Sequence, residues 1–144
     1  MTTAQHTLAD HDLRELQELI AEHSWLLDHG RWHQLADLYV DDGSLAVGPR
    51  VIQGREAFLG WADQRVTNPG RRTHHQCTNL RLARAANGTA EGTVMLVLHV
   101  SNDAQPAEIE FVGEYRDRYR RDAQGRWRFQ HRALISISDP FEPS

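Results

Sequence analysis

The sequence predicts an α+β domain in which three N-terminal helices pack inside a strongly curved, mostly antiparallel sheet, forming a cone-shaped barrel. In the first half of the chain, apolar residues recur at helical spacing. After Asn68-Pro69-Gly70, four long strand-like segments follow one another, joined by turns too short for crossover helices. The 144 residues suit one domain of the usual ~100–200 residues, so we expect residues 1–144 to form one unit. A cone of this kind has an open mouth that can hold a small ligand.

The first helix is predicted over Leu8–Asp28. Its apolar stripe consists of Leu13, Leu16, Ile20 and Leu27. Thr7 or Asp10 can cap its start, because short polar side chains accept hydrogen bonds from the free N–H groups of the first turn. Gly30 suits the left-handed position that follows a helix, so we expect the helix to end near Asp28.

Two shorter helices and a small hairpin are predicted next. The second helix covers Trp32–Tyr39, and Asp41–Gly43 is predicted to be a turn that breaks the helical pattern. The segments Ser44–Val47 and Val51–Gln53 indicate a hairpin around a Gly-Pro turn. The third helix spans Gly54–Val66, where Phe58, Leu59 and Trp61 supply apolar bulk.

The second half of the chain consists of four predicted strands. They are Arg72–Arg84, Thr89–Ser101, Ala107–Arg120 and Arg126–Ile137. The stretch Val94–Val100 in the second of them is apolar on both faces, which is typical of a strand covered on both sides. One side would meet the helices and the other a second subunit, so we expect a homo-oligomer, either a trimer or a dimer.

Strand alternation predicts which side chains share a face. On the third strand, the predicted buried face carries Ile109, Phe111, Tyr115 and Tyr119. On the first strand, His75 shares its face with Cys77 and Asn79. The opposite face carries His74, Leu80 and Leu82. The adjacent pair His74-His75 thus ensures that one imidazole points into the cone and the other out of it.

Composition excludes several classes of protein. The apolar fraction of 40% and charged fraction of 25% are those of a domain with a buried core. The net charge of −4 gives no attraction to nucleic acid or anionic membrane, and we read the basic run Arg116–Arg121 as a solvated strand face. No apolar run approaches the ~20 residues of a membrane span, and the polar N-terminus does not resemble a signal peptide. We therefore expect a cytoplasmic protein with no nucleic-acid or membrane partner.

Cofactor and metal chemistry find little support in the residues. Cys77 is the only cysteine and all 16 basic residues are arginine. This excludes an internal disulfide, a cysteine-rich zinc site, a Schiff-base lysine and a lysine-dependent phosphate loop. His29 and His33 have metal-ligand spacing, but Gly30 breaks the helix between them. We expect neither a metal nor a cofactor.

Asp28 and His75 are the strongest candidate site residues. Asp28 lies in the last turn of its helix, where the helix dipole disfavours a carboxylate by roughly 0.3–1 kcal/mol. It is either an exposed acid at a frayed end or a buried acid that orients a histidine, and His75 is the best partner. His23 lies near the pocket-lining face of the same helix, and His99 interrupts an apolar strand, where a polar group needs a partner. Cys77 is interpreted as cavity lining rather than as a nucleophile.

Three segments carry a resemblance to a known family. They are WLLDHGRWHQLADLYVDDGSLAV, RTHHQCTNLRL and VGEYRDRYRRDAQGRWRF. The chain from about Leu8 to Ile137 resembles the SnoaL-like group of the nuclear-transport-factor-2-like superfamily. It is most similar to the branch with scytalone dehydratase, hexachlorocyclohexane dehydrochlorinase and bile acid dehydratase. In that branch, the catalytic Asp and His correspond to Asp28 and His75.

The resemblance also implies positions that contact substrate. The second cavity histidine of scytalone dehydratase falls near His99, and the arginine of the dehydrochlorinase falls on Arg132. His23 stands where the dehydrochlorinase has a lysine. Two tyrosines of scytalone dehydratase are replaced here by about Leu27 and Val47, which argues against that particular substrate. Alternation along the last strand lets either Arg132 or His131 face the cavity, unless a bulge intervenes.

These observations lead to one main hypothesis. We expect a cofactor-independent lyase or isomerase of the dehydratase or cyclase type that acts on a hydrophobic, cyclic small molecule. His75 would remove a carbon-bound proton and Asp28 would fix its tautomer, while His99, Arg132 or Tyr115 would bind the leaving group or the developing oxyanion.

Two alternatives remain open at this point. In the first, which follows the chemistry of ketosteroid isomerase, Asp28 is itself the base and Tyr115 or Tyr119 is the oxyanion donor. In the second, the protein is a non-catalytic ligand-binding or β-type assembly subunit, and its histidines merely line the cone.

Overall fold

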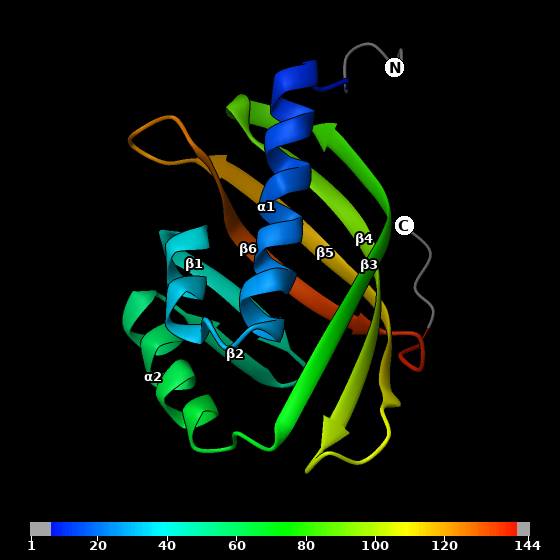
Figure 1. The fold of residues 1–144 in the computed structure, drawn as a ribbon. Helices are drawn as coiled ribbons and strands as arrows, with labels where there is room; N and C mark the ends of the chain where they lie inside the picture. The colour runs from blue at the N-terminus through cyan, green and yellow to red at the C-terminus, as the bar shows by residue number, and fades with distance from the viewer. Residues whose placement is uncertain (1–6, 141–144) are drawn as a thin grey trace.

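The computed structural model describes residues 7–140 (Figure 1). Its helical elements are α1 (Asp10–Asp28), the 3₁₀ helix η2 (Trp32–Leu38), α2 (Arg55–Val66) and the short 3₁₀ turn η3 (Ala86–Gly88). Its strands are β1 (Tyr39–Val47), β2 (Arg50–Gln53), β3 (Arg71–Arg84), β4 (Ala90–Asn102), β5 (Glu108–Arg121) and β6 (Trp127–Ser136). The four long strands lie within one or two residues of their predicted bounds.

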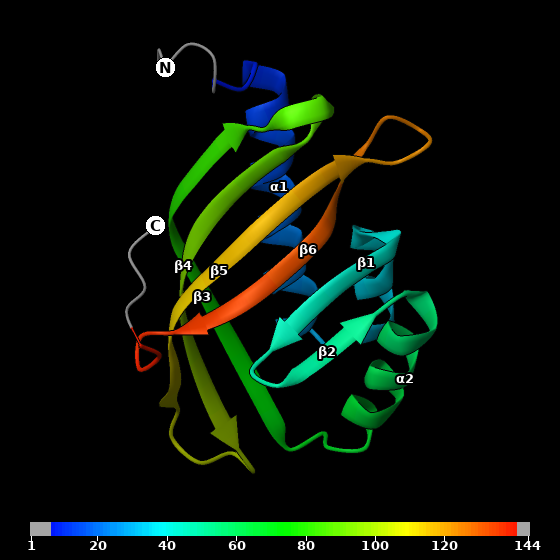
Figure 2. The same cartoon turned by 180° about the vertical axis from the view of Figure 1, so that it is seen from behind.

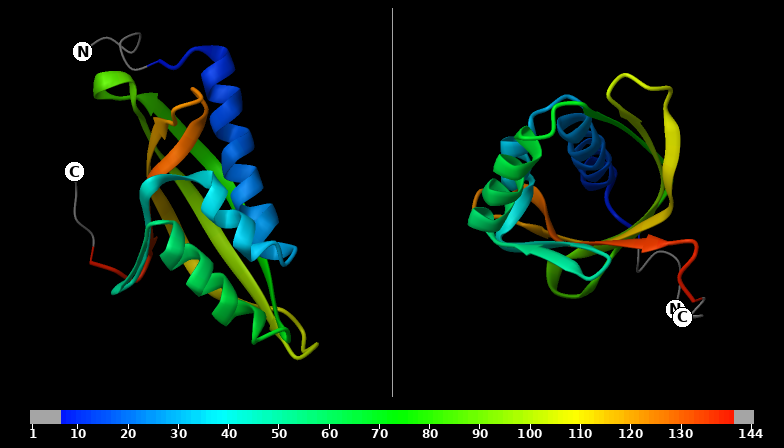
Figure 3. Two further views of the ribbon diagram at one scale, coloured as in Figure 1. Left: turned by 90° about the vertical axis from the view of Figure 1, so that its left-hand side faces the viewer. Right: turned by 90° about the horizontal axis from the view of Figure 1, so that it is seen from below.

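The strands form one six-stranded sheet in the order β2-β1-β6-β5-β4-β3. Strands β3 to β6 form an antiparallel meander, whereas β1 runs parallel to β6, so the sheet is mixed (Figure 2). The sheet is curled but not closed, and α1 lies along its concave side while α2 covers the β1–β2 end (Figure 3). This arrangement confirms the predicted α+β cone with three helices against a curved sheet.

The region between η2 and β1 differs from the sequence-based prediction. Trp32–Leu38 is a 3₁₀ helix, and Asp41–Gly43 lies within β1 instead of forming a turn. A Cβ at Gly43 would lie 2.9 Å from the Val40 carbonyl oxygen and 3.0 Å from that of Phe129. Gly43 is therefore required because two backbones approach closely where β1 joins β6. At the start of α1, the N-cap position is held by Ala9 rather than by Thr7 or Asp10.

Two bulges change the predicted faces of β3 and β5. Asn79, with φ of 53°, lies at a register shift in β3, which turns Leu80 and Leu82 to the same inner side as Cys77. In β5, Phe111 pairs with Leu98 of β4 and Ile109 pairs with His99, so Glu110 is the extra residue. Ile109 therefore points outward and is 61% exposed. Each bulge adds one unpaired residue and so reverses the alternation beyond it.

A third bulge decides which side chain of β6 enters the interior. Arg118 pairs with His131 and Tyr119 pairs with Phe129, so Gln130 is the extra residue. Trp127, Phe129 and Arg132 consequently all point inward. This resolves the alternative left by simple alternation, because Arg132 and not His131 lies inside.

The core fills the space between α1 and the concave face of the sheet. The stripe of α1 that packs there contributes Leu16, Leu19, Ile20 and Leu26, all at most 5% exposed. From the sheet come Val94, Leu96, Tyr115, Tyr119, Trp127 and Phe129. Each such side chain contributes roughly 1.5–3 kcal/mol on burial, so this packing fixes the position of α1 and of its last residue. Within residues 7–140, no helix has both the length and the apolar character of a membrane span.

Candidate active site

Asp28 and His75 meet where the last turn of α1 crosses the inner face of β3. His75 Nδ1 lies 2.6 Å from Asp28 Oδ1, and the His75 backbone N–H donates to Asp28 Oδ2 at 2.9 Å. The Thr73 hydroxyl also donates to Oδ1, at 2.9 Å. The two side chains are only 11% and 10% exposed, so the acid at the helix end is not a frayed surface group. The structure thus brings together the two residues that the sequence singled out.

The hydrogen bonds on Asp28 keep it ionised. Burial alone would raise the pKa of this carboxyl group, but the hydrogen bonds from His75 and Thr73 favour the charged form and leave the pKa below its ordinary value of 3.8. The charged carboxylate of Asp28 accepts a hydrogen bond from Nδ1–H of His75 and so leaves Nε2 as the unprotonated ring nitrogen. Within residues 7–140, no hydrogen-bond partner lies on Nε2, which is therefore free to act as a base.

A cavity of about 250 Å³ opens beside the imidazole of His75. Most of its wall is apolar and is formed by Leu27, Trp32, Leu45, Ile52, Trp61, Leu98 and Leu134. Thr73, His23 and Tyr115 add a few polar groups, and three arginines, Arg50, Arg65 and Arg71, also belong to the wall. A small apolar chamber with a few convergent polar groups is typical of a site for a small, mostly hydrophobic ligand.

Tyr115 projects from β5 into this cavity. The residue is 4% exposed, and within residues 7–140 its hydroxyl has no hydrogen-bond partner. Burial raises the pKa of Tyr115, so the phenol stays protonated and can donate a hydrogen bond. The guanidinium of Arg132 lies over the Tyr115 ring at 3.6 Å from its centroid, which favours the ring position through a cation–π contact.

Arg132 is not among the residues that line the cavity, so the expectation that it contacts substrate is corrected. Its Nε and Nη2 donate to the two carboxylate oxygens of Asp117 at 2.8 and 2.9 Å, and both side chains are 0% exposed. The Tyr119 hydroxyl also donates to Asp117, at 2.6 Å. Burial would lower the pKa of Arg132, but the charge and hydrogen bonds of Asp117 raise it. The guanidinium is therefore permanently charged and held in place by Asp117.

His23 reaches the cavity but cannot supply a positive charge. The residue is 0% exposed, and its Nε2 lies 2.9 Å from the Tyr39 hydroxyl. Burial and the nearby charge of Arg132 lower the pKa of His23 well below 6.5, so the imidazole is neutral. The lysine suggested by the family resemblance is thus replaced by an uncharged group at this position.

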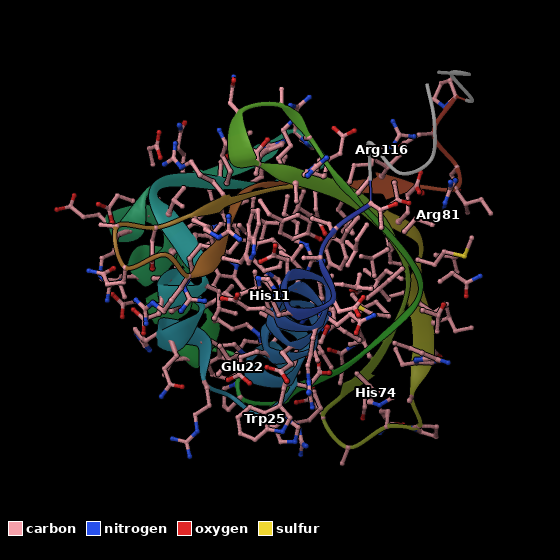
Figure 4. All side chains as sticks on the ribbon, turned by 90° about the horizontal axis from the view of Figure 1, so that it is seen from above. His11, Glu22, Trp25, His74, Arg81 and Arg116 are labelled. Atoms are coloured by element: carbon pink, nitrogen blue, oxygen red, sulfur yellow. The ribbon has the colours of Figure 1, made fainter. Side chains whose placement is uncertain are left out.

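The structure does not bring His99 into the cavity. The sequence-based expectation placed this histidine among the substrate contacts, but β3 and β4 align His99 with His74, whose side chain lies outside the curled sheet (Figure 4). The two rings are 5.9 Å apart on this outer face. Because His75 is the inward member of the His74-His75 pair, the cross-strand partner of His74 must point outward. We therefore correct the position of His99.

Cys77 lies one inward position beyond His75 on β3. Its Sγ is 3.3 Å from the Ser24 hydroxyl oxygen, a hydrogen-bond contact. Burial raises the pKa of this thiol, and no base in residues 7–140 contacts it. A protonated, half-buried thiol is a poor nucleophile. Cys77 is not among the residues that line the cavity beside His75, so its predicted lining role is corrected to packing against the core. In the part of the chain that the structure describes, no three His, Cys, Asp or Glu side chains are grouped as metal ligands would be.

Comparison with known proteins identifies the family. The sequence matches the SnoaL-like domain over residues 10–133. The chain belongs to the SnoaL-like family. This confirms the resemblance that was inferred from the sequence, and the family includes polyketide cyclases and dehydratases. Among curated proteins, no match was found.

Several solved structures have the same fold as this SnoaL-like protein. A Mycobacterium tuberculosis protein of unknown function is 26% identical, with 90% of this chain and 76% of that chain covered and a TM-score of 0.78. A Novosphingobium aromaticivorans protein named as a candidate scytalone dehydratase is 22% identical (88% and 85% covered, TM-score 0.77). A Catenulispora acidiphila protein in complex with S-DNPA is 20% identical (85% and 92% covered, TM-score 0.73). The last two show that the fold is shared.

Two residues of this SnoaL-like site were not singled out from the sequence. Thr73 lies on the same strand as His75 and donates a hydrogen bond to Asp28. The sequence could have indicated this contact, because residues two apart on a strand share a face. Asp117 lies between Tyr115 and Tyr119 on the buried face of β5. A carboxylate on a predicted core face requires a buried cation, and that signal could have identified Asp117 as the partner of Arg132.

Proposed function

We propose that this SnoaL-like protein is a cofactor-independent lyase or isomerase of the dehydratase or cyclase type, acting on a hydrophobic, cyclic small molecule. The observation that carries the proposal is the 2.6 Å contact between His75 Nδ1 and Asp28 Oδ1 at the wall of an apolar cavity. Asp28 holds the proton on Nδ1, and the lone pair on Nε2 of His75 is left to accept a proton.

The proposed reaction begins with proton transfer from carbon to His75. The C–H electrons of the substrate move toward an adjacent carbonyl group, and the Tyr115 hydroxyl donates a hydrogen bond to the developing oxyanion. In a lyase, a leaving group on the neighbouring carbon then departs as the double bond forms. In an isomerase, the imidazolium returns the proton to another carbon. Asp28 stabilises the imidazolium in both cases.

The surroundings of Asp28 favour His75 over Asp28 as the base. Asp28 accepts hydrogen bonds from the His75 ring, the His75 backbone and Thr73, and its pKa is lowered. A carboxylate that already accepts three hydrogen bonds and has a low pKa is a poor proton acceptor. The isomerase alternative with Asp28 as the base is therefore less well supported than the dyad.

A generic proton-transfer probe tests the proposal without knowledge of the natural substrate. A base that removes the ring C–H proton of 5-nitrobenzisoxazole breaks the N–O bond and releases a coloured cyanonitrophenolate. We expect the protein to accelerate this ring opening and the His75→Ala variant to lose about 10²–10⁴-fold in kcat/KM. The Cys77→Ala variant is the matched control, because Cys77 shares the strand face but carries no proposed chemical role.

Two outcomes would contradict the dyad. If His75→Ala keeps the wild-type rate while Asp28→Asn loses it, Asp28 is the base. If neither variant differs from wild type while a hydrophobic aromatic ligand such as 2-naphthamide still binds in the cavity, the protein is better described as a non-catalytic binding or assembly subunit.

We also propose that the protein is a homo-oligomer, a trimer or a dimer, assembled through the outer face of the sheet. Four apolar side chains on and beside this face are strongly exposed: Met95 53%, Ile109 61%, Val112 39% and Ile137 75%. Exposed apolar patches on a sheet face are typical of association surfaces. Light scattering at micromolar concentration should give a multiple of 16.5 kDa, and a monomer mass would refute the assembly.

A further inference from the structure

Three arginines stand at the opening of the cavity that holds His75. Arg50, Arg65 and Arg71 belong to its wall, although the rest of that wall is mostly apolar. A neighbouring cleft of about 260 Å³ shares Arg65 and Arg71, adds Arg72, and reaches Asp28 from its other side. The opening is therefore strongly cationic, in contrast to the apolar interior.

The carboxylates around this opening do not neutralise all three cations. Arg71 is paired with Glu110 through hydrogen bonds of 2.9 and 2.6 Å, and Asp28 is engaged by His75. Within residues 7–140, neither Arg50 nor Arg65 forms an ion pair with an acidic side chain. Arg50 contacts only the neutral amide of Gln64, at 3.5 Å.

Arg65 is held in one orientation while most of its hydrogen-bonding capacity stays free. One Nη group donates to the Asn68 carbonyl at 2.7 Å and the other to the Arg71 carbonyl. The guanidinium also lies over Trp32, at 4.4 Å from the ring centroid. These contacts use two of the five guanidinium N–H donors. An arginine whose position is fixed by backbone oxygens and an aromatic face loses little entropy when it binds an anion.

Electrostatics at Arg65 also favour a bound anion. Partial burial and the repulsion from the adjacent charge of Arg71 lower the pKa of Arg65. The guanidinium nevertheless stays charged at physiological pH. An oxyanion bound to Arg65 would offset this repulsion and replace lost hydration with charge-assisted hydrogen bonds.

We infer that the substrate carries an oxyanionic group, a carboxylate or a phosphate, that binds to Arg65 and Arg50 at the cavity opening. Its apolar portion extends inward between Trp32, Trp61 and Leu98 toward His75. This inference rests on the proposed function for the identity of the reacting end, and it adds a charged anchor to a ligand otherwise expected to be hydrophobic. The two arginines determine substrate specificity and do not take part in the proton transfer.

Binding of three naphthalene probes tests the anchor directly. Isothermal titration calorimetry would compare 2-naphthoate, 2-naphthyl phosphate and the neutral 2-naphthamide, which share one ring system. We expect wild-type protein to bind the better anion at least roughly tenfold more tightly than the amide, as charge-assisted hydrogen bonds allow. A higher affinity for naphthoate assigns a carboxylate, and a higher affinity for the phosphate ester assigns a phosphate.

Variants separate the anchor from general effects on the fold. Arg65→Gln and Arg50→Gln should each lower anion affinity several-fold while naphthamide affinity changes less than twofold. Arg65→Lys should retain part of the preference because it keeps the charge. The Arg50→Gln variant is expected to fold normally, because Arg50 is exposed and makes one weak contact. A loss of anion affinity in this variant therefore reports on the anchor and not on misfolding. Arg118→Gln, on the exposed outer side of β5, is the matched control and should change nothing.

The outcome is independent of the proposed catalytic dyad. His75→Ala should abolish the ring opening of 5-nitrobenzisoxazole yet keep the preference for the anionic probe. Equal affinity of wild-type protein for anionic and neutral probes would overturn the anchor even if His75 proves to be the base. A preference that persists in the Arg50→Gln/Arg65→Gln double variant would overturn it as well.

Discussion

Two acid–base pairs lie on the same concave face, an outer pair of Asp28 with His75 and an inner pair of Asp117 with Arg132. They differ in whether the basic partner can exchange a proton near neutral pH. Asp28 and His75 sit at the cavity wall with 11% and 10% of their side chains exposed, whereas Asp117 and Arg132 are 0% exposed. Both carboxylates accept three hydrogen bonds. An imidazole gains and loses a proton near neutral pH, but a guanidinium does not. The outer pair is therefore suited to proton transfer, and the inner pair to holding Tyr115 and the sheet in place.

The largest effect on stability is expected from separating the inner pair. Asp117→Ala leaves a buried guanidinium without its counter-ion, which costs about 3–5 kcal/mol of unfolding free energy. Urea denaturation followed by circular dichroism would measure this loss. Replacing both residues, Asp117→Leu with Arg132→Met, should restore much of it, because no unpaired charge remains. A cost below about 1 kcal/mol for Asp117→Ala would show that the pair is not the structural element proposed.

Changes to the pair of Asp28 and His75 should act most strongly on the reaction rate. Asp28→Asn is expected to lower the ring-opening rate by about 10²-fold, because the amide no longer holds the imidazole in the reactive tautomer. The double variant Asp28→Asn/His75→Ala should be hardly slower than His75→Ala alone, since Asp28 acts through the imidazole that it orients. Losses that multiply would instead give Asp28 a role of its own.

Acid should reveal how much the ionised carboxylate of Asp28 contributes to stability. The pKa of Asp28 is lowered in the folded protein, so its ionised form contributes stability that is present above its unfolded value near 3.8 and is lost as pH falls through the lower folded value. The unfolding free energy of wild-type protein should therefore exceed that of Asp28→Asn at pH 6, and the difference should shrink as pH falls below about 3.8. A difference that stays constant from pH 6 to pH 3 would contradict the assignment.

The smallest effect is expected at Cys77. Its thiol contacts Ser24 and burial keeps it protonated, so Cys77→Ala should change the ring-opening rate less than about threefold. Thiol-directed alkylation should likewise be slow in the folded protein. Rapid alkylation that abolishes activity would show that the thiol is closer to the reacting atoms than proposed.

Most elements of the fold could be predicted from local periodicity. The meeting of Asp28 with His75 could be predicted because periodicity turned both side chains toward the cone and the family resemblance pointed to the same two residues. Helical spacing placed Asp28 at the end of its helix, and the His74-His75 pair ensured one inward imidazole. The predicted placement of His99 in the cavity was wrong. The face on which His99 lies was settled by its pairing with His74, and cross-strand register cannot be obtained from one strand alone. The bulges at Asn79 and Gln130 and the close approach at Gly43 are also properties of paired backbones.

Because β6 contains one extra residue, the number of residues in this strand decides which of its side chains face the interior. Because Gln130 is an extra residue in β6, every side chain after it lies on the face opposite to the one that simple alternation would give it. Without it, the imidazole of His131 would take the interior place of the guanidinium, and Leu134 would leave the cavity wall for the solvent. Deletion of this one residue would thus reverse the facing of six consecutive side chains, residues 131–136, up to the end of the strand. The hairpin turn a few residues earlier, by contrast, could change in length without inverting anything.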